Sequence, residues 1–517
     1  SQDYINLTFN AQDWLDKPHL QFIITALFYK YLGVHVYSYI LPGFLFNLLG
    51  ARYTYLLAKK MYQSKEVGLF ASLFYLTSVH LMLSSIDVRQ EAFLLGEIMP
   101  ACYYWFLYQE DGGSNKMHNL LLGAFFSALA VMTKGIFVLI LIFSGVFFKY
   151  LYAKKLRQFF CIKWLLALIL IFIFILPELF ALYWQFDMHP EKLVFGRYGV
   201  SGLKFFFIDS QFGRFFNNGP ISVNNNGALA HYFYYIHTLL CAVLPWTPLF
   251  LIALWNVATT FRISTDIPEN KQVKLNYVYL LGSIIPILIL FSLTRFQLDH
   301  YTNIIIPFIC ILCADWIYNK ATRLNQHFVL YIEIFLSFIL VIAVFILTVL
   351  ILTGMAFYLS FGASAIVVIA LVVLNNNYNL TKAVVYPVLA ILLVFVFCML
   401  VNGTIYGRYD IGYQITRDIN IQKNIPIVDY KINSSSLEFN AKNTYLRIDN
   451  EPNLLSVRRP FYLVVSRDNW NQLKDYFLGA EVIKKSAWIR EEKFIPTLIN
   501  KNNKKNNIID VYTVKIQ

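Results

Sequence analysis

Long apolar runs, separated by short polar connections, dominate the chain up to residue 402. A polar segment covers residues 1–17, and residues 19–33 predict a short amphipathic helix with Pro18 at its first turn, where proline is compatible with a helix. Most later runs approach the ~20 residues that cross about 30 Å of hydrocarbon. They predict twelve membrane-spanning helices, at residues 38–58, 67–86, 91–108, 118–132, 135–152, 163–184, 232–258, 275–294, 301–319, 328–353, 356–374 and 383–402.

The pattern changes after residue 402, where alternating apolar and polar positions predict short strands around one helix. The strands are expected at residues 425–430, 445–449, 461–465 and 508–516, and the helix at residues 468–477. We therefore predict two domains. A transmembrane domain covers residues 1–402, with a juxtamembrane segment at 1–37 and a large external loop at 185–231, and a small α/β domain covers residues 403–517.

Composition supports a membrane protein. Hydrophobic residues make up 58% of the chain and charged residues 14%, whereas soluble domains average about 45–50% and 25%. We predict a polytopic α-helical membrane protein that contacts membrane lipids. The net charge of +13 would suggest nucleic acid as a partner of a soluble protein, but basic connections on the cytoplasmic side account for it here, so we expect no nucleic-acid partner.

The connections between the runs alternate between basic and non-basic. The positive-inside rule places the basic set in the cytoplasm, so the other set, residues 1–17 and the C-terminal domain are expected outside. The basic set contains Lys59, Lys60, Lys65, Lys116, Lys154, Lys155, Arg157, Lys271, Lys274, Lys320, Arg323 and Lys382. With this orientation the first run crosses inward, so either the N-terminus is external or a preceding helix is absent from this sequence.

Isolated charges in the external connections are candidates for chemistry. Lys17 is suited to hold a phosphate as a point charge, and Asp16 to bind a cation or orient a sugar, although the two could be a solvated pair at a helix start. Glu91 follows Arg89 at a helix start, where the helix dipole stabilises any acid. Lys134 lies between two runs, where a lysine can also snorkel to the membrane surface.

Two further external segments add cations and aromatic side chains. The loop at 185–231 contains Arg214 among many phenylalanines, and loops of this length are often functional lids. The second segment brings an arginine, a histidine and a phenol close together, as Arg295, His300 and Tyr301. Several cations, a few carboxylates and an aromatic cover on one side of the membrane suit a polyprenyl phosphate.

Five short motifs follow one another on this side of the predicted membrane. They are Asp16-Lys17-Pro18, Arg89-Gln90-Glu91, Thr133-Lys134-Gly135, Tyr234-Tyr235 with Leu244-Pro245-Trp246, and Ser292-Leu293-Thr294-Arg295 with His300-Tyr301 and Pro307. Through them the chain resembles, over nearly its whole length, the membrane glycosyltransferases that use polyprenyl-phosphate sugars. The lipid A aminoarabinose transferases of bacteria are the nearest of these, and protein O-mannosyltransferases are more distant.

The resemblance implies a GT-C fold with thirteen spans and a periplasmic C-terminal domain, in the bacterial inner membrane. It implies inverting transfer of a sugar from undecaprenyl phosphate to lipid A, another envelope glycolipid or a protein. It gives Asp16 and Glu91 catalytic, orienting roles, and places the first span and the principal acid upstream of Ser1. The residues expected to bind the donor or acceptor are Lys17, Arg89, Lys134, Arg214, Arg295, His300 and Tyr301.

The chain also departs from the pattern of these enzymes. His19 stands where a second proline is usual, and Glu91 replaces an aspartate. The metal-binding histidine that these enzymes often carry in the large loop has no obvious counterpart, so a divalent cation remains open, with Asp16 as its assigned ligand. A transporter or flippase of lipid-linked sugars is the alternative of another class. It predicts charged or broken helices at the bilayer midplane, whereas the charges here gather at one surface.

Overall fold

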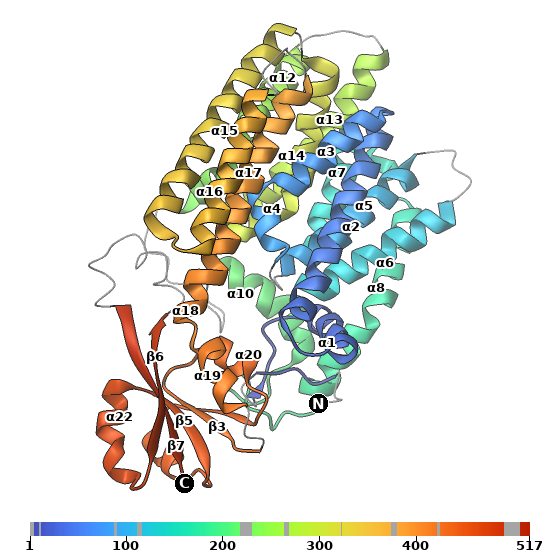
Figure 1. Cartoon of the computed structure of the whole chain (residues 1–517). Coiled ribbons are helices and arrows are strands. Elements are labelled where there is room, and N and C mark those ends of the chain that lie inside the picture. Colours follow the sequence, from blue (N-terminus) through green and yellow to red (C-terminus); the bar gives the residue numbers. More distant parts are fainter. Residues whose placement is uncertain are drawn as a thin grey trace. The chain divides into compact units, whose positions relative to one another are not determined.

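A computed structural model gives the fold of the chain (Figure 1). The structure describes residues 5–9, 12–86, 90–110, 116–217, 230–262, 268–321, 323–373, 380–420, 424–490 and 507–517. The chain divides into two compact units. The first comprises Ser1–Ser337 and Tyr378–Val388, and the second comprises Phe338–Asn377 and Leu389–Gln517.

The first unit is almost entirely helical. Its N-terminal segment forms a small hairpin of β1 (Thr8–Phe9) and β2 (Gln12–Asp13). The helices that follow are α1 (Leu20–Leu32), α2 (Val36–Tyr62), α3 (Lys65–Thr77), α4 (Val79–Ser84), α5 (Gln90–Gln109), α6 (Lys116–Lys134), α7 (Val138–Tyr152), η1 (Leu156–Gln158), α8 (Ile162–Leu182), η2 (Tyr183–Asp187), α9 (Gly202–Lys204), η3 (Phe205–Asp209), α10 (Ser210–Phe216), α11 (Ala230–Ala242), α12 (Thr247–Arg262), α13 (Pro268–Leu293), η4 (Asp299–Ile305), α14 (Ile306–Asp315), η5 (Trp316–Lys320) and α15 (Arg323–Ile351), whose later part belongs to the second unit.

Two of the predicted spans are broken. Residues 67–86 form α3 and α4, which are interrupted at Ser78, and residues 232–258 form α11 and α12, which meet at 114°. The second break contains Pro245, which has no backbone N–H to continue a helix. In the described parts of the chain, seven helices are long and apolar enough to cross a membrane, or eight if this bent pair is one span. The number of twelve spans therefore stays a prediction.

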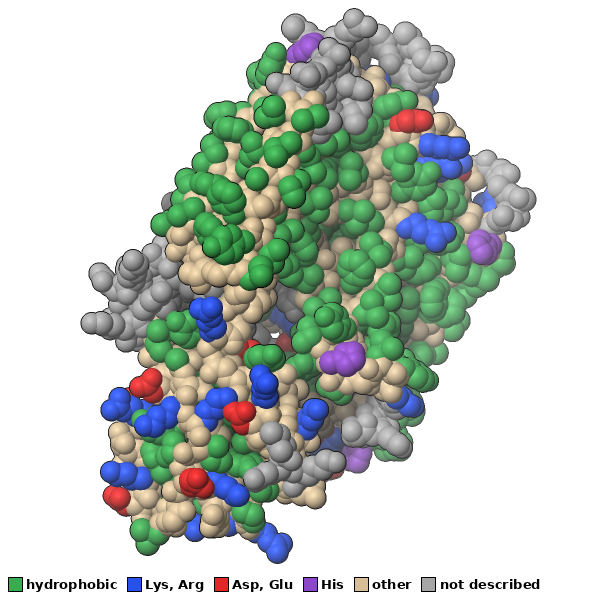
Figure 2. Space-filling model, viewed as in Figure 1, with side chains coloured by type: hydrophobic (Ala, Val, Ile, Leu, Met, Phe, Trp, Pro, Cys, Tyr) green, Lys and Arg blue, Asp and Glu red, His purple; other side chains and the backbone are tan. Residues whose placement is uncertain are grey.

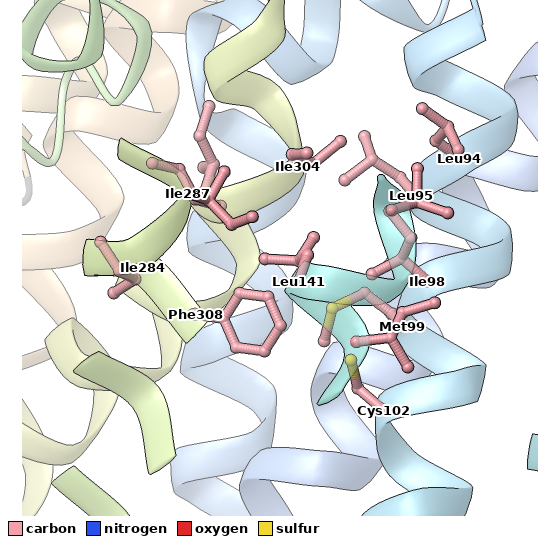
Figure 3. Packing of buried hydrophobic residues seen from close by; sticks show 14 of the residues in the cluster. Leu94, Leu95, Ile98, Met99, Cys102, Leu141, Ile284, Ile287, Ile304 and Phe308 are labelled. Carbon is pink, nitrogen blue, oxygen red and sulfur yellow. The ribbon is translucent and has the colours of Figure 1, made fainter. Parts of the chain in front are cut away.

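Apolar side chains from α5, α7, α13 and α14 fill the interior of the first unit. Figure 3 shows Leu95 and Met99 of α5 near Leu141 of α7, with Ile287 of α13 and Phe308 of α14 facing them. Helix α2 approaches α5 closely at Gly96 of α5, where an added Cβ would collide with the carbonyl oxygen of Phe46 in α2. This close packing holds α5, whose first turn carries the candidate site residue Glu91, against α2.

The second unit joins three long helical segments to a mixed sheet. The part of α15 after Ser337 packs with α16 (Met355–Val373) and α17 (Leu380–Val401). The remaining elements are η6 (Asn402–Tyr406), α18 (Gly407–Tyr409), α19 (Ile411–Ile419), β3 (Ile427–Tyr430), α20 (Ser435–Asn440), β4 (Tyr445–Ile448), α21 (Glu451–Leu455), β5 (Phe461–Ser466), α22 (Arg467–Leu473), η7 (Lys474–Tyr476), β6 (Glu481–Ile489) and β7 (Ile508–Ile516).

The sheet has the strand order β4-β3-β5-β7-β6. Strand β3 runs parallel to β4 and β5, with Tyr430 opposite Ile448 and Val465, while β7 runs antiparallel to β5 and β6. The four expected strands are confirmed. Strand β6 was missed because its register shifts between Val482 and Lys484, which disturbs the alternation of apolar and polar residues.

The helices and the sheet differ in the polarity of their surfaces. In Figure 2 hydrophobic side chains cover the helices, whereas lysine, arginine, aspartate and glutamate gather over the sheet. Large apolar side chains of the long helices are exposed, including Phe172, Phe335 and Ile369. A contiguous apolar surface of this kind is stable only against lipid or another protein, and together with the candidate spans it makes the chain a multi-pass membrane protein.

Candidate active site

Charged side chains from three parts of the first unit converge on a small polar cavity. Its volume is about 20 Å³, which holds about one water molecule. The residues come from the segment before α1, from the facing ends of α5 and α6, and from η3 and α10 of the long loop. The lining residues are Leu15, Asp16, Lys17, Pro18, Gln90, Lys134, Gly135, Leu182, Phe205, Phe206, Ser210, Gln211 and Arg214.

One carboxylate holds two of the cations. Asp16 Oδ1 accepts a hydrogen bond from Arg214 Nη2 at 2.6 Å, and the Asp16 carbonyl oxygen accepts another at 3.0 Å. Asp16 Oδ2 lies 3.5 Å from Lys17 Nζ. Both carboxylate oxygens therefore face cations, and these contacts fix α10 against the segment that precedes α1.

A second carboxylate holds the third cation. Lys134 Nζ donates to Glu91 Oε1, and both side chains are buried. His300 Nε2 lies 3.6 Å from the same Glu91 oxygen. Lys134 Nζ also lies 4.3 Å from the centre of the Tyr301 ring, a distance at which a cation is attracted to the face of an aromatic ring. Lys134 is thus positioned by a carboxylate and a phenol ring from two other segments.

The end of α6 explains the Thr133-Lys134-Gly135 motif. Gly135 has φ +101° and donates its N–H to the Val131 carbonyl oxygen at 2.8 Å, as a glycine that ends a helix does. A Cβ at this position would lie 2.5 Å from Gln211 Nε2. Thr133 Oγ1 donates to Glu97 Oε1 at 2.8 Å. Only glycine allows α6 to end here with the loop directly against it.

His19 ties the N-terminal segment to α8. Its Nδ1 lies 2.9 Å from Glu178 Oε1 and its Nε2 lies 2.9 Å from the Ile5 carbonyl oxygen. Gln185 also joins the two parts, since it donates to the Leu7 carbonyl oxygen at 2.8 Å and accepts from the Leu7 N–H at 3.0 Å. The His19 side chain stands directly after Asp16, Lys17 and Pro18 and is buried, so this network holds one wall of the polar cavity in place.

A larger, apolar cavity adjoins the polar one. Its volume is about 480 Å³. Four residues line both cavities, namely Lys134, Ser210, Gln211 and Arg214. The other walls of the apolar cavity are Ile136, Phe137, Ile140, Phe207, Phe212, Phe215, Phe216, Leu290, Phe291, Thr294 and Tyr301. A cationic cavity and an apolar cavity therefore border the same four residues.

Cations outnumber carboxylates at the polar end. Lys17, Lys134 and Arg214 face Asp16 and Glu91, which leaves one positive charge in excess before His300 is considered. Burial and the neighbouring Arg214 charge lower the pKa of Lys17 to about 8. The like charges therefore oppose one another, and an anion between them would relieve that repulsion.

The structure brings together most of the side chains predicted from the sequence. Asp16, Lys17, Lys134 and Arg214 share the polar cavity, while Glu91, His300 and Tyr301 contact Lys134 or its ion pair. The side chain of Arg295 is exposed and lines neither cavity, although its N–H donates to the Phe215 carbonyl oxygen at 3.1 Å. Arg89 lies outside the described residues.

Several contributors were missed at the sequence level. Ser210 and Gln211 line both cavities, but polar residues in a loop carry no signal of their own. Glu97 and Glu178 lie within apolar runs, and an acid inside a predicted span is a signal for a functional or structural partner. These two acids can be recognised from the sequence, but their partners Thr133 and His19 follow only from the packing.

A divalent cation at this site would need several free oxygen ligands. Both oxygens of Asp16, the ligand assigned from the sequence, face Arg214 or Lys17. Across the described residues, no group of three or more histidine, cysteine, aspartate or glutamate side chains is arranged to hold a metal ion. The described residues around Asp16 therefore do not fit a divalent cation, which prefers several oxygen ligands.

Comparison with solved structures identifies the fold. The crystal structure of ArnT from Cupriavidus metallidurans bound to undecaprenyl phosphate matches 99% of this chain and 90% of its own length, with a TM-score of 0.71 and 16% identity. The chain has the GT-C fold. The apo structure of the same protein matches with a TM-score of 0.70 and 15% identity. The fold expected from the sequence resemblance is therefore confirmed.

Sequence comparisons found one family model and one relative. Residues 16–184 match the family model described as dolichyl-phosphate-mannose-protein mannosyltransferase. A protein of Aquifex aeolicus (strain VF5), described as uncharacterized, is 24% identical over 388 residues, which are 74% of this chain and 68% of that protein. The matched range of the family model contains Asp16, Lys17, Glu91 and Lys134, and it ends before Arg214 and Tyr301.

Proposed function

We propose that the protein is a glycosyltransferase that takes a sugar from a polyprenyl-phosphate donor. One observation carries the proposal: Lys134 and Arg214 line both the polar cavity and the apolar cavity. A ligand that lies in the apolar cavity with its headgroup at Lys134 and Arg214 would need an anionic group joined directly to an apolar chain. A polyprenyl phosphate has this construction, and ArnT of Cupriavidus metallidurans, which has the same fold, was crystallised with undecaprenyl phosphate.

The reaction needs the phosphate to leave. An oxygen of the acceptor forms a bond to the anomeric carbon of the sugar, while the bond from that carbon to the phosphate oxygen breaks, with inversion. The leaving polyprenyl phosphate gains negative charge, which Lys17, Lys134 and Arg214 would stabilise. Such electrostatic stabilisation by groups already in place is commonly the largest contribution to catalysis. A hydroxyl acceptor also needs a base for its proton, whereas an ionised phosphate acceptor does not.

The carboxylates have a positioning role in this scheme. Asp16 pairs with Arg214 and Lys17, and Glu91 pairs with Lys134. All three cations are therefore held in position before the donor binds. We further assign Asp16 and Glu91 to orienting the sugar or the acceptor, and Arg89, Arg295, His300 and Tyr301 to binding donor or acceptor groups.

We place the reaction at the periplasmic face of a bacterial inner membrane. Helix α6 is 19 residues long: it begins at Lys116, in a basic connection, and ends at Lys134, which lines the cavity. A helix of that length spans about 28 Å, so its two ends belong at opposite membrane surfaces. The positive-inside rule puts Lys116 in the cytoplasm, which leaves the cavity on the outer side.

The acceptor has two candidates. Lipid A or another envelope glycolipid follows from the motif resemblance and from the ArnT fold. A protein acceptor is favoured by the family model that matches residues 16–184, whose description names a protein mannosyltransferase. Mass spectrometry of lipid A and of periplasmic proteins, from cells with and without the intact gene, separates the two. A sugar lost from one fraction identifies the acceptor, and unchanged masses in both fractions would overturn the proposed transfer.

A further inference from the structure

The sheet of the second unit carries a separate polar cavity. Its volume is about 330 Å³, within the range of small-molecule sites. Two segments build it: the loop after β3, with Lys431, Asn433, Ser434 and Ser435, and the end of β6, with Trp488 and Arg490. Among the described residues that line it, two are cations and none is a carboxylate.

The sheet topology brings these two segments to one edge. Strand β5 is parallel to β3, and β7 is antiparallel to both β5 and β6, so β6 runs parallel to β3 and β5. The carboxyl ends of β3 and β6 therefore share one edge. In open α/β sheets, ligands bind outside the carboxyl ends of the strands, and the cavity lies at this edge. Strands β5 and β7 stand between β3 and β6, so the cavity lies across the edge and not between two neighbouring strands.

The loop after β3 is held in a defined shape. The buried Asp429 carboxylate accepts hydrogen bonds from the N–H groups of Ile432 at 2.9 Å, Asn433 at 3.2 Å and Ser434 at 3.3 Å, and from Tyr445 Oη at 2.6 Å. Lys431 and Asn433 both adopt positive φ, at 59° and 57°. A non-glycine residue with positive φ is uncommon and is kept only where its surroundings enforce it.

Both cations of the cavity lie beside aromatic rings. The Arg490 guanidinium lies 5.9 Å from the centre of the Trp488 ring and Lys431 Nζ lies 5.0 Å from that of Tyr430. A guanidinium that rests on an aromatic ring still presents its N–H groups to a phosphate. Both cationic side chains are exposed, and the nearby acid Asp449 accepts from Asn433 Nδ2 at 3.5 Å. Ser435 adds a hydroxyl group, which suits the hydroxyl groups of a sugar.

We propose that this cavity binds a phosphorylated sugar, with the phosphate on Lys431 and Arg490 and the sugar against the serine and asparagine side chains. The assignment deepens the proposed function, because a phosphorylated sugar is the headgroup chemistry of a glycolipid acceptor. Binding can be measured without turnover, so failure of the proposed transfer and failure of this site are distinguishable.

The test is calorimetric titration of the purified full chain with glucosamine 1-phosphate, inorganic phosphate and glucosamine. We expect saturable binding of the sugar phosphate, at least tenfold tighter than that of either fragment. The Lys431→Gln/Arg490→Gln double variant should bind it at least tenfold more weakly, while Lys474→Gln, an exposed lysine of the same unit outside the cavity, should bind as the parent does. Thermal melting confirms that each variant is folded.

Three outcomes would overturn the proposal. They are no saturable binding of the sugar phosphate, equal affinity in the parent and the double variant, and loss of binding in Lys134→Gln, which would place the ligand in the first unit. If inorganic phosphate bound as tightly as the sugar phosphate, the proposed contacts of the sugar with the serine and asparagine side chains would be refuted. Vesicles that contain a phosphorylated glycolipid then distinguish the two possible ligands. If the chain binds the vesicles more tightly than the free sugar phosphate, the ligand is a lipid headgroup. If it binds them more weakly, the ligand is a free sugar phosphate.

Discussion

Asp16 Oδ1 and Arg214 Nη2 lie 2.6 Å apart, although 198 residues separate them in the chain. The same carboxylate group reaches Lys17 Nζ at 3.5 Å through its other oxygen. A single acid therefore sets the positions of two cations that would otherwise repel each other. This arrangement makes Asp16 a positioning residue for the proposed phosphate site, and it has a direct consequence for substitution.

Asp16→Asn should weaken binding of polyprenyl phosphate by about tenfold, because it removes a charge-assisted pairing of about 1.5–3 kcal/mol that holds Arg214. The matched control is Asp510→Asn, since Asp510 forms an exposed ion pair with Arg467 at 3.6 Å in the second unit and lines neither cavity. Titration with undecaprenyl phosphate in detergent measures both variants. Equal affinities in the two variants would contradict the positioning role.

Lys17 makes donor binding dependent on pH. Its pKa is lowered to about 8 by burial and by the Arg214 charge, so the ammonium group loses its proton as the pH rises through about 8. We expect affinity for polyprenyl phosphate to fall about tenfold between pH 7 and pH 9.5. Lys17→Arg keeps its charge over this range and should flatten the profile, whereas Lys192→Arg should leave it unchanged. A parent profile that is flat from pH 7 to 9.5 would refute this role.

The buried Glu91–Lys134 pair should affect stability as well as binding. Glu91→Gln or Lys134→Met leaves one buried charge unpaired, which costs about 3–5 kcal/mol. The double variant leaves no such charge and should recover much of the lost stability without recovering sugar transfer. Thermal unfolding in detergent, together with a transfer assay, checks both parts.

An exposed ion pair provides the control for that experiment. Lys60 and Glu110 lie 3.0 Å apart with more than a third of each side chain exposed, so Glu110→Gln should cost about 1 kcal/mol or less. Additive losses at Glu91 and Lys134 would mean that the two side chains do not act as a pair. Full transfer activity in Lys134→Met would show that Lys134 does not bind the donor phosphate.

His19 should make stability decrease as the pH rises. Burial acts to lower its pKa, but the hydrogen bond and charge of Glu178 outweigh burial and raise the pKa above 6.5. The stabilisation is therefore fully present below about pH 6.5 and is lost as the pH rises through the folded-state value. Glu178→Gln should lower the melting temperature more at pH 6 than at pH 9.

The control for His19 is an exposed pair of the same kind. His189 Nδ1 lies 2.9 Å from Glu191 Oε1 at the surface, so Glu191→Gln should change the melting temperature little at either pH. If Glu178→Gln and Glu191→Gln behaved alike, the His19 network would not hold the N-terminal segment as described.

Much of the architecture could be predicted from the sequence because its pattern is simple. In a chain with few charges, a charged residue at the end of an apolar run marks a helix end, and Glu91 and Lys134 are placed by that rule. The breaks at Ser78 and Pro245 were not predicted, since the apolar runs continue through them. The β6 strand was missed for the opposite reason, because its bulge disrupts an otherwise regular pattern.

The detailed geometry of the site could not be predicted in the same way. The contact of Asp16 with Arg214 depends on how η3 and α10 fold within the long loop, and no local periodicity records that fold. The pairing of His19 with Glu178 is equally distant in sequence. The sequence placed Asp16 and Arg214 among charges expected on one side of the membrane and gave no indication of Glu178, and distances and partners emerge only from packing.

The most direct measurement is the affinity of the full chain for undecaprenyl phosphate in the parent and in Arg214→Gln, with undecaprenol as the uncharged ligand. We expect Arg214→Gln to bind the phosphate at least tenfold more weakly, and the parent to prefer the phosphate strongly over the alcohol. Lys204→Gln, an exposed lysine of the same loop, should match the parent. Equal affinity of the parent and Arg214→Gln for the phosphate, or equal affinity of the parent for phosphate and alcohol, would contradict a cationic site for a polyprenyl phosphate.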